Sequence, residues 1–343
     1  MKNIGILLFV FVSANIFSQS LNDTASNSLL NRYIQKYDRL IGLKLSLNND
    51  IEIFDVHSDP LDFTIVPNTA LKSSFSVDYR FISFAVSYAP EFLPDNNDDE
   101  TRGTSEIFSF GFTTYPGRLV QRAEMERING FFLQNTGDYI PNFEAYIQFP
   151  DLVYSAISGS TGYNLNPRFS LKALTSQTER QLKSTGTLIP ELNYRYYVID
   201  DRTTLTEANS SQKSNNFEVI AQLKAFYSWV LHEKWYMSGS LSFGGGKIYS
   251  ILKTRFYNQK YTSINSNYIW RGEAQIAFGY NSKRVFAGLQ SIYRMENYKQ
   301  GNSTSTISNE GFTFQVFAGY RFNAPKVIDS FINDLVSTLN LNK

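Results

Sequence analysis

Few side chains in this sequence are placed where they could carry out covalent chemistry. Two histidines occur in 343 residues, and cysteine is absent. His57 is followed directly by Ser58 and Asp59, but a catalytic triad is defined by spatial roles that three consecutive residues cannot fill by themselves. His232 stands beside Glu233 in a polar stretch typical of a turn. Both histidines are best interpreted as surface residues, and we expect no enzymatic activity.

The acidic run at residues 95–100 offers oxygen atoms, which are the ligands that calcium prefers. Its spacing lacks the ligand pattern and the central glycine of a calcium-binding loop. The absence of cysteine also excludes disulfides and a lipoprotein acylation site. We therefore expect a solvated acidic loop in this region, with no metal and no cofactor bound by the chain.

Charge and composition narrow the class of protein. The chain carries 32 basic and 31 acidic residues, so we expect no nucleic-acid partner. Aromatic residues reach 15%, and tyrosine and phenylalanine favour half-buried strands and membrane interfaces. At the N-terminus, Lys2 precedes an apolar run at 4–17 that is too short to span a bilayer. Together with the small residues that follow, this run predicts a secretory signal peptide over residues 1–20.

Alternation of apolar and polar residues is the clearest structural signal. Between Phe217 and Trp229 the odd positions are apolar or small, whereas the even positions include Glu218, Gln222 and Lys224. A period of two predicts strands that have one apolar face. The pattern predicts twelve strands, at residues 39–48, 69–80, 82–90, 104–115, 118–134, 150–166, 168–199, 217–231, 235–251, 264–280, 284–299 and 311–322.

The connections between these strands alternate in length. After even-numbered strands they are tight, whereas after odd-numbered strands they are longer and polar, at 49–68, 91–103, 135–149, 200–216, 252–263 and 300–310. Outer-membrane barrels have short periplasmic turns and long outer loops. A soluble antiparallel sandwich is the alternative, but its strands would be shorter and its long loops would not all lie on one side. We predict an all-β fold, an antiparallel transmembrane β-barrel of about 12 strands in the bacterial outer membrane, surrounded by lipid and lipopolysaccharide.

If the apolar faces meet lipid, the opposite faces point into the lumen. The candidate lumen residues are Arg122, Glu124, Glu126, Glu191, Asn193, Arg195, Lys224, Arg271, Glu273, Arg294, Glu296 and Arg321. Both signs of charge occur in similar numbers, whereas an ion-selective pore favours one sign. Barrels of eight strands are filled by side chains, and those of about 16 or more leave a channel. Twelve strands with mixed charges predict a narrow or plugged lumen.

A polar tract interrupts the seventh strand region, at residues 168–199. At about 3.3 Å per residue this region would reach roughly 100 Å as one strand, although about 9–11 residues cross a membrane. We expect residues 169–174 to begin the strand, residues 176–187 to leave the wall, and residues 188–199 to complete the crossing. Irregular backbone at membrane depth is tolerated only inside the protein or facing a water-filled cavity. The tract contains Gln177, Glu179, Arg180, Gln181 and Lys183.

These plug candidates should fold inward, and their charges should pair with Arg122, Glu124, Arg271 and Glu273. A bulged strand that protrudes beyond the outer surface is the alternative.

Both ends of the chain place apolar residues at helical spacing. We expect a periplasmic N-terminal helix or linker at 21–38, the barrel at 39–322 and a periplasmic C-terminal helix at 323–343. An even strand count leaves both termini in the periplasm. The terminal helices are interpreted as caps over the barrel mouth, and a docking site for a periplasmic partner is the alternative.

Three tracts resemble a known family. They are residues 169–186, which include Gln177-Thr-Glu-Arg-Gln-Leu-Lys-Ser-Thr-Gly186, residues 279–289, and the closing Gly319-Tyr-Arg-Phe322. Over nearly the whole mature chain the sequence is similar to a Bacteroidetes outer-membrane family catalogued as domain of unknown function 4421. The resemblance implies a barrel in the outer membrane and no particular activity.

Two hypotheses for the function remain open. The barrel could bind or pass a small hydrophilic or amphipathic molecule, as a porin-like protein with a narrow or plugged lumen. Alternatively, it could serve in structure or assembly and anchor a periplasmic or surface partner. The mixed lumen charge does not decide between them, and the sequence names neither a ligand nor an oligomeric state.

Overall fold

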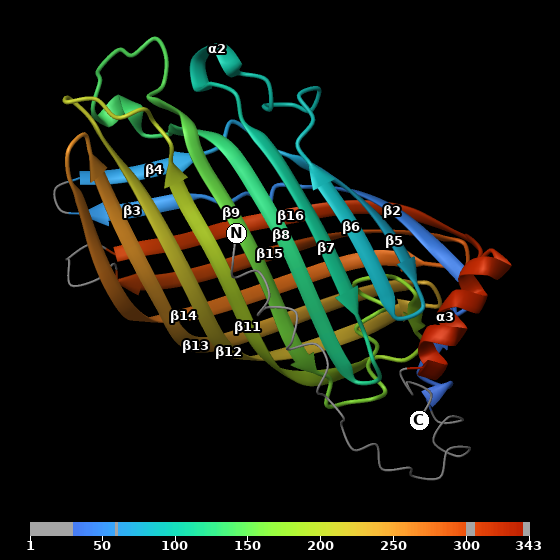
Figure 1. Ribbon diagram of the computed structural model, residues 1–343. Helices are drawn as coiled ribbons and strands as arrows, with labels where there is room; N and C mark the ends of the chain where they lie inside the picture. The colour runs from blue at the N-terminus through green and yellow to red at the C-terminus, as the bar shows by residue number, and fades with distance from the viewer. Residues whose placement is uncertain (1–29, 59–60, 300–305, 339–343) are drawn as a thin grey trace.

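Strands in which every second side chain faces outward form the wall of the molecule. The computed structural model describes residues 30–58, 61–299 and 306–338. The wall strands are β2 (Leu40–Asn48), β5 (Lys72–Tyr79), β6 (Ile82–Tyr88), β7 (Glu106–Thr114), β8 (Leu119–Leu133), β9 (Gln148–Tyr163), β11 (Thr185–Asp201), β12 (Ser210–His232), β13 (Trp235–Phe256), β14 (Lys260–Asn281), β15 (Val285–Lys299) and β16 (Thr306–Asn323). Neighbours are antiparallel, and β16 pairs with β2 to close a barrel (Figure 1). The predicted all-β barrel of 12 strands is confirmed.

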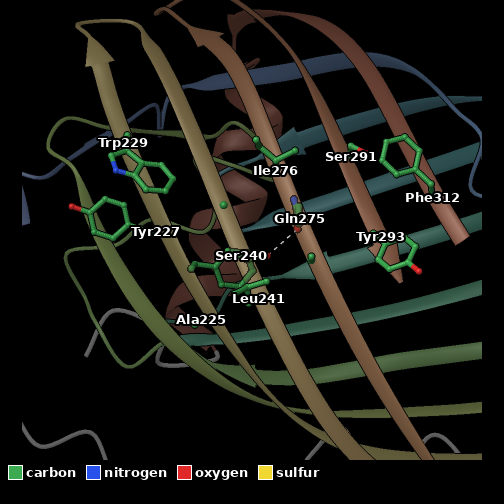
Figure 2. A pocket seen from close by; sticks show the side chains of 13 residues that line it. Ala225, Tyr227, Trp229, Ser240, Leu241, Gln275, Ile276, Ser291, Tyr293 and Phe312 are labelled. Atoms are coloured by element: carbon green, nitrogen blue, oxygen red, sulfur yellow. Dashed lines mark hydrogen bonds between the residues drawn. The ribbon is translucent and has the colours of Figure 1, made fainter. Parts of the chain in front are cut away.

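The outward face of the wall carries large apolar side chains. Leu241 and Phe243 are each 68% exposed, and Val316 is 53% exposed. A band of such residues around a closed sheet is typical of a wall in contact with lipid. Within the band, small residues of β12, β13 and β14 leave an open hollow of about 580 Å³, which Trp229 and Tyr293 border (Figure 2). This hollow lies on the outward, apolar face of the wall.

The wall is uneven in height. Strands β2, β5, β6 and β7 have 7 to 9 residues, whereas β12, β13 and β14 have 22 or 23. Above the short strands lies a hairpin of β3 (Phe54–Ser58) and β4 (Leu61–Val66). It bridges the wall, because β3 pairs with β16 and β4 pairs with β8. The loop expected at 49–68 is therefore partly a strand hairpin, whose strands are too short to show a clear period.

The long strands rise beyond the apolar band. Counted along β13 from the short-turn end, Lys247 is the first charged residue whose side chain faces outward. Its Nζ lies 5.1 Å from the ring centroid of Tyr268 on β14. Basic and aromatic side chains gather at membrane interfaces. Past Lys247, β13 continues to Phe256 and turns directly into β14. Most of the loops expected at 200–216 and 252–263 is therefore strand, and their polar composition is that of strands outside the lipid.

Short helices are confined to the ends and the loops. At the long-loop end lie α2 (Asp99–Arg102) and the 3₁₀ turn η1 (Thr136–Asp138). α3 (Lys326–Thr338) follows β16 at the short-turn end, where Asp329 accepts hydrogen bonds from Tyr79 and Arg80. Among the described residues, no helix is long and apolar enough to cross a membrane.

The N-terminal segment differs from its prediction. β1 (Ile34–Lys36) is a strand where a helix was expected, because it pairs with a short strand inside the barrel mouth. α3 covers residues 326–338 of the region expected to form a C-terminal helix. The proposed signal peptide lies outside the described residues.

Candidate functional site in the barrel lumen

The connection between β9 and β11 forms a plug inside the barrel mouth at the short-turn end. The plug consists of residues 164–184 and contains β10 (Glu179–Gln181), which pairs with β1. Its central side chains are enclosed: Gln177 is 0% exposed, and Thr178 and Glu179 are each 4% exposed. Polar groups buried to this extent need hydrogen-bond partners. The plug therefore has to be bonded to the wall or to itself.

Gln177 joins the plug to three wall strands. Its side-chain amide donates to the Tyr236 hydroxyl at 3.1 Å and accepts from Asn281 Nδ2 at 2.8 Å. Its backbone carbonyl accepts from Arg321 Nε at 2.9 Å and from a second nitrogen of the same guanidinium. Gln177 also has a φ of 58°, a left-handed conformation that residues other than glycine adopt only where contacts fix it. We call this set of contacts around Gln177 the latch.

Arg321 is the charged member of the latch and is 1% exposed. Its guanidinium carbon lies 4.4 Å from the ring centroids of both Tyr37 and Phe286. It also donates to Asn281 Oδ1 at 2.8 Å and to the Ser282 carbonyl at 2.5 Å. Carbonyl oxygens and aromatic faces thus compensate the buried charge. Burial raises the pKa of Tyr37, whose hydroxyl has no hydrogen-bond partner in the described chain.

The charged residues of the plug find partners close by. Glu179 accepts from Ser170 Oγ and from Lys172 Nζ, each at 2.6 Å. Lys183 Nζ lies 5.4 Å from the ring centroid of Tyr33. Gln181 accepts the backbone N–H of Ser170 and donates to three carbonyls, and Arg180 has a buried Nε without a hydrogen-bond partner in the described residues.

The expected pairing of the plug charges with Arg122, Glu124, Arg271 and Glu273 is wrong for Glu179. This carboxylate is already bonded within the plug, to Ser170 and Lys172.

The start of the seventh wall strand also differs from its prediction. Residues 169–174 form a turn inside the mouth, and the wall resumes only at Thr185. Phe169 is 2% exposed and packs 5.9 Å from the Phe226 ring, so it does not face lipid. Asn164 fixes the turn by donating to the Phe169 carbonyl at 2.8 Å and accepting from Thr187 Oγ1 at 2.7 Å. In the sequence, Phe169 has the position expected of a lipid-facing residue at the start of a strand, but in the structure its ring faces inward.

Above the plug, charged side chains from four strands meet across the lumen. Glu218, which is 1% exposed, accepts from Arg195 at 2.8 Å and from Arg271 at 2.7 Å. Glu296 pairs with the same two arginines. Glu52, from the segment between β2 and β3, pairs with Arg195 at 3.0 Å. Multiple pairing of this kind offsets the desolvation of each charge.

Two further sets of ion pairs extend this network. Lys224 lies 2.9 Å from Glu191 and 3.4 Å from Glu273, and Glu273 lies 3.0 Å from Arg294. On the opposite wall, Lys72 and Glu126 form a pair of 3.0 Å, and Lys72 is 7% exposed. Most of the candidate lumen charges thus pair with one another. We call these residues together the ion-pair network.

A polar cavity of about 290 Å³ lies beside the network, above the plug. Its floor includes Thr175 and Ser176, and Lys44 donates to the Thr175 carbonyl at 2.9 Å. Arg122 and Glu124 line it without an ion-pair partner among the described residues. Hydroxyl side chains form part of its remaining wall, which includes Ser46, Ser74, Ser76, Ser83, Ser87, Ser109 and Thr113. We call this space the lumen cavity.

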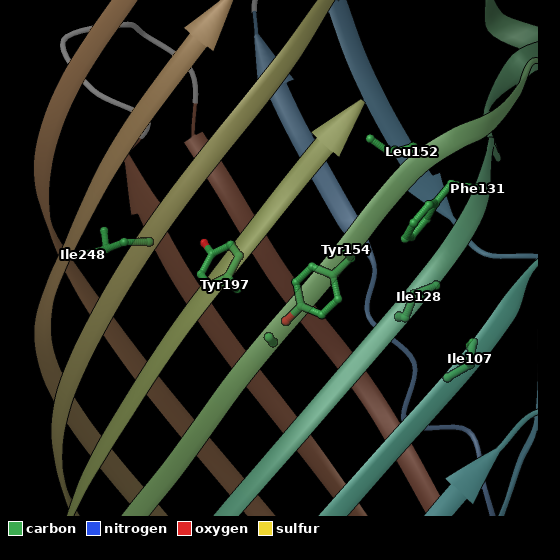
Figure 3. Close-up of a cluster of buried hydrophobic side chains, with 8 residues drawn as sticks. Ile107, Ile128, Phe131, Leu152, Tyr154, Tyr197 and Ile248 are labelled. Atoms are coloured by element: carbon green, nitrogen blue, oxygen red, sulfur yellow. The ribbon is translucent and has the colours of Figure 1, made fainter. Parts of the chain in front are cut away.

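Toward the long-loop end, apolar side chains fill the lumen. Ile107, Ile128, Tyr154, Tyr197 and Ile248 point inward from five strands and are at most 5% exposed (Figure 3). Phe54 of β3 enters this cluster, 5.6 Å from the Phe131 and Tyr154 ring centroids. Inward faces are apolar here because the hairpin and the segment before it fold down onto the wall. The lumen is thus occupied at both ends.

Comparison with known proteins places this geometry in context. The model of a family described as "Domain of unknown function (DUF4421)" matches residues 22–322. No curated protein matches the chain.

Among solved structures, the chain is similar to the outer membrane protease OmpT from Escherichia coli, with 8% identity and a TM-score of 0.39, over 84% of this chain and 98% of that one. It is also similar to the β domain of the Bordetella autotransporter BrkA, with 11% identity and a TM-score of 0.39, over 84% and 100% of the two chains. Ail, the attachment invasion locus protein of Yersinia pestis, matches with 9% identity and a TM-score of 0.22, over 83% of this chain and 99% of that one.

Proposed function

The chain belongs to the DUF4421 family, and from this premise we propose that it is an outer-membrane barrel that binds a small hydrophilic molecule in its closed lumen. The lumen cavity carries the proposal. It is polar, it lies above the plug and beside the ion-pair network, and it contains Arg122 and Glu124 without ion-pair partners in the described chain. Arg122 is exposed to this space and Glu124 is half-buried, so both groups are accessible to a ligand or to water in the cavity.

The cavity chemistry suggests the class of ligand. About 290 Å³ is close to the lower end of ligand pockets, which span roughly 300–1,000 Å³. The cations Lys44 and Arg122, the anion Glu124 and several serine hydroxyl groups suit a zwitterion or a polyol of the size of an amino acid or a hexose. Binding is favoured over free passage, because a solute would have to displace the plug on one side and the apolar cluster on the other.

We place the short-turn end and both termini in the periplasm, following the rule for outer-membrane barrels. The proposal includes no catalysis. His57 lies in β3 at the long-loop end. His232 lies at the turn between β12 and β13 and does not line the lumen cavity.

Native mass spectrometry of the purified barrel tests this proposal. The wild-type protein, incubated with amino acids and with hexoses, should retain one small molecule. The double variant Arg122→Gln with Glu124→Gln should lose most of it. Arg127→Gln is the matched control, because Arg127 lies on the same strand, faces away from the cavity and is exposed. A wild-type protein that adds no mass with any of these solutes would exclude the proposed ligand class.

The structural role is the second candidate, and exposed apolar residues on α3 favour it. Val327 is 80% exposed and Ile328 is 39% exposed, although Ile332 on the same helix packs beside Ile41 and Tyr79. A helix that is docked and still presents apolar residues could hold a periplasmic partner. Deleting residues 326–343 should then remove co-purifying proteins. Unchanged partners and an unchanged envelope would count against this role.

A further inference from the structure

The projecting part of β14 has a free edge. Residues 260–268 pair with β13 on one side, and β15 joins β14 only from Ile269, so this stretch has no second strand neighbour among the described residues. Its side chains are open to solvent: Tyr261 is 58% exposed, Ile264 76% and Tyr268 79%. The edge lies past Lys247 and Tyr268, which mark the end of the apolar band. It is therefore presented outside the lipid.

The hydrogen-bonding groups of this edge follow from the hairpin that precedes it. Phe256 donates its backbone N–H to the Gln259 carbonyl at 2.8 Å, which closes the turn between β13 and β14. In an antiparallel pair, hydrogen-bonded and non-bonded positions alternate. Odd-numbered residues of β14 therefore bond to β13. The even-numbered residues Lys260, Thr262, Ile264, Ser266 and Tyr268 direct their backbone groups toward the free side.

Within the described residues, this edge lacks the usual protection against edge pairing. Proteins block exposed edges with charged residues, prolines or bulges. Residues 261–268 read Tyr-Thr-Ser-Ile-Asn-Ser-Asn-Tyr, without a charge or a proline, and their register with β13 is regular. Such an edge can accept an additional strand through backbone hydrogen bonds.

We propose that this edge pairs with the same edge of a second copy held in a facing membrane. Two copies in one membrane differ by a rotation about the membrane normal. Strands tilted by about 35–45° would then cross at roughly 70–90° and could not pair. A copy in a facing membrane is related by a two-fold axis in the membrane plane, which makes the two edges antiparallel. Contact between two cells through this edge rests on the orientation given under the proposed function, in which the long-loop end of the barrel lies outside the cell.

The sequence of the edge complements itself in this arrangement. With Ile264 opposite Ile264, Thr262 lies opposite Ser266, and Lys260 lies opposite Tyr268. All of these positions are even-numbered, so the free backbone groups of one copy face those of the other. The two isoleucines make an apolar contact at the centre, and no like charges oppose each other. One pair of strands buries little area, so adhesion between membranes depends on many simultaneous contacts.

Cysteine cross-linking tests both the pairing and its register, because the chain contains no cysteine. Opposed residues in a hydrogen-bonded antiparallel pair have Cα atoms about 5.5 Å apart, within the disulfide range of about 4.4–6.8 Å. In nanodiscs that hold one barrel each, Ile264→Cys should form a disulfide-linked dimer under mild oxidation. Thr262→Cys and Ser266→Cys should each stay monomeric alone and cross-link when mixed. Asn258→Cys, at the hairpin tip, controls for random collision.

A fold-preserving variant completes the test. Ile264→Pro removes only an N–H that faces the free side, so the barrel should fold. This substitution should abolish the cross-link between Thr262→Cys and Ser266→Cys. The proposal is overturned if Ile264→Cys cross-links no faster than Asn258→Cys, or if Thr262→Cys cross-links alone as fast as in the mixture. Nanodiscs expose both barrel ends and the assay contains no solute, so these results do not depend on the lumen proposal or on orientation in the cell.

Discussion

Replacing Arg321 with methionine should loosen the plug and leave the barrel wall folded. The substitution removes the donor to two buried acceptors, the Gln177 carbonyl and Asn281 Oδ1. A buried acceptor left without a partner costs about 1–3 kcal/mol, so closure of the plug should weaken by about 4 kcal/mol. The flexible methionine side chain still fills the space between Tyr37 and Phe286, which keeps the loss of packing small.

A loss of about 4 kcal/mol corresponds to a factor of about 1,000 in the ratio of open to closed plug. Thr178→Cys reports this ratio, because position 178 is 4% exposed and would carry the only cysteine. A thiol reagent modifies such a site mainly through local opening. In the Arg321→Met background the rate of modification should rise about 1,000-fold.

Arg284→Met is the matched control. Arg284 donates to the Arg321 carbonyl and to Asn323, and within the described part of the chain its side chain forms no hydrogen bond or ion pair with the plug. Resistance of the barrel to unfolding in SDS should be unchanged in both variants. If Arg321→Met accelerates modification no more than Arg284→Met while the barrel stays folded, Arg321 does not hold the plug closed.

Two further predictions concern the ion-pair network and the latch. Glu218→Gln leaves Arg195 and Arg271 with fewer partners, so the free energy of unfolding in detergent should fall by about 3–5 kcal/mol. Glu106 is exposed, so Glu106→Gln should change that free energy by less than about 0.5 kcal/mol. Equal effects of the two substitutions would contradict the role of the ion-pair network. Burial raises the Tyr37 pKa above its ordinary value of 10.0, so the closed state holds that proton more tightly than the open state. Closure of the plug should be fully favourable below pH 10 and should weaken as the pH rises above 10. The rate of Thr178→Cys modification, corrected for thiol ionisation, should therefore rise over the same pH range. Tyr37→Phe should abolish the rise, and its persistence there would assign the effect to another group.

The barrel wall could be predicted from the sequence because it is encoded locally. In each crossing, the lipid selects apolar side chains at every second position, so the period of two appears without knowledge of the partner strand. Because charged side chains avoid lipid, Arg271, Glu273 and Glu296 indicated which strand faces point inward. Their pairing with Arg195, Glu218 and Lys224 depends on the register of four strands.

The plug and the hairpin were harder to predict because long-range contacts determine them. β10 pairs with β1, about 145 positions earlier in the chain, and each strand has only three residues. The lumen role of Glu52 was missed, although its neighbours Ile51, Ile53 and Phe54 gave a usable signal. A charge among apolar residues is unusual in an exposed loop and indicates a segment that folds into the protein.

Conductance in a planar bilayer tests the closed lumen most directly. The plug, the ion-pair network and the apolar cluster lie at successive levels of the barrel, so the wild-type protein should insert and produce no conductance steps. Insertion should be verified by resistance of the reconstituted barrel to protease. Steady, ohmic conductance through the inserted wild-type barrel would contradict the closed lumen and the binding function proposed from it.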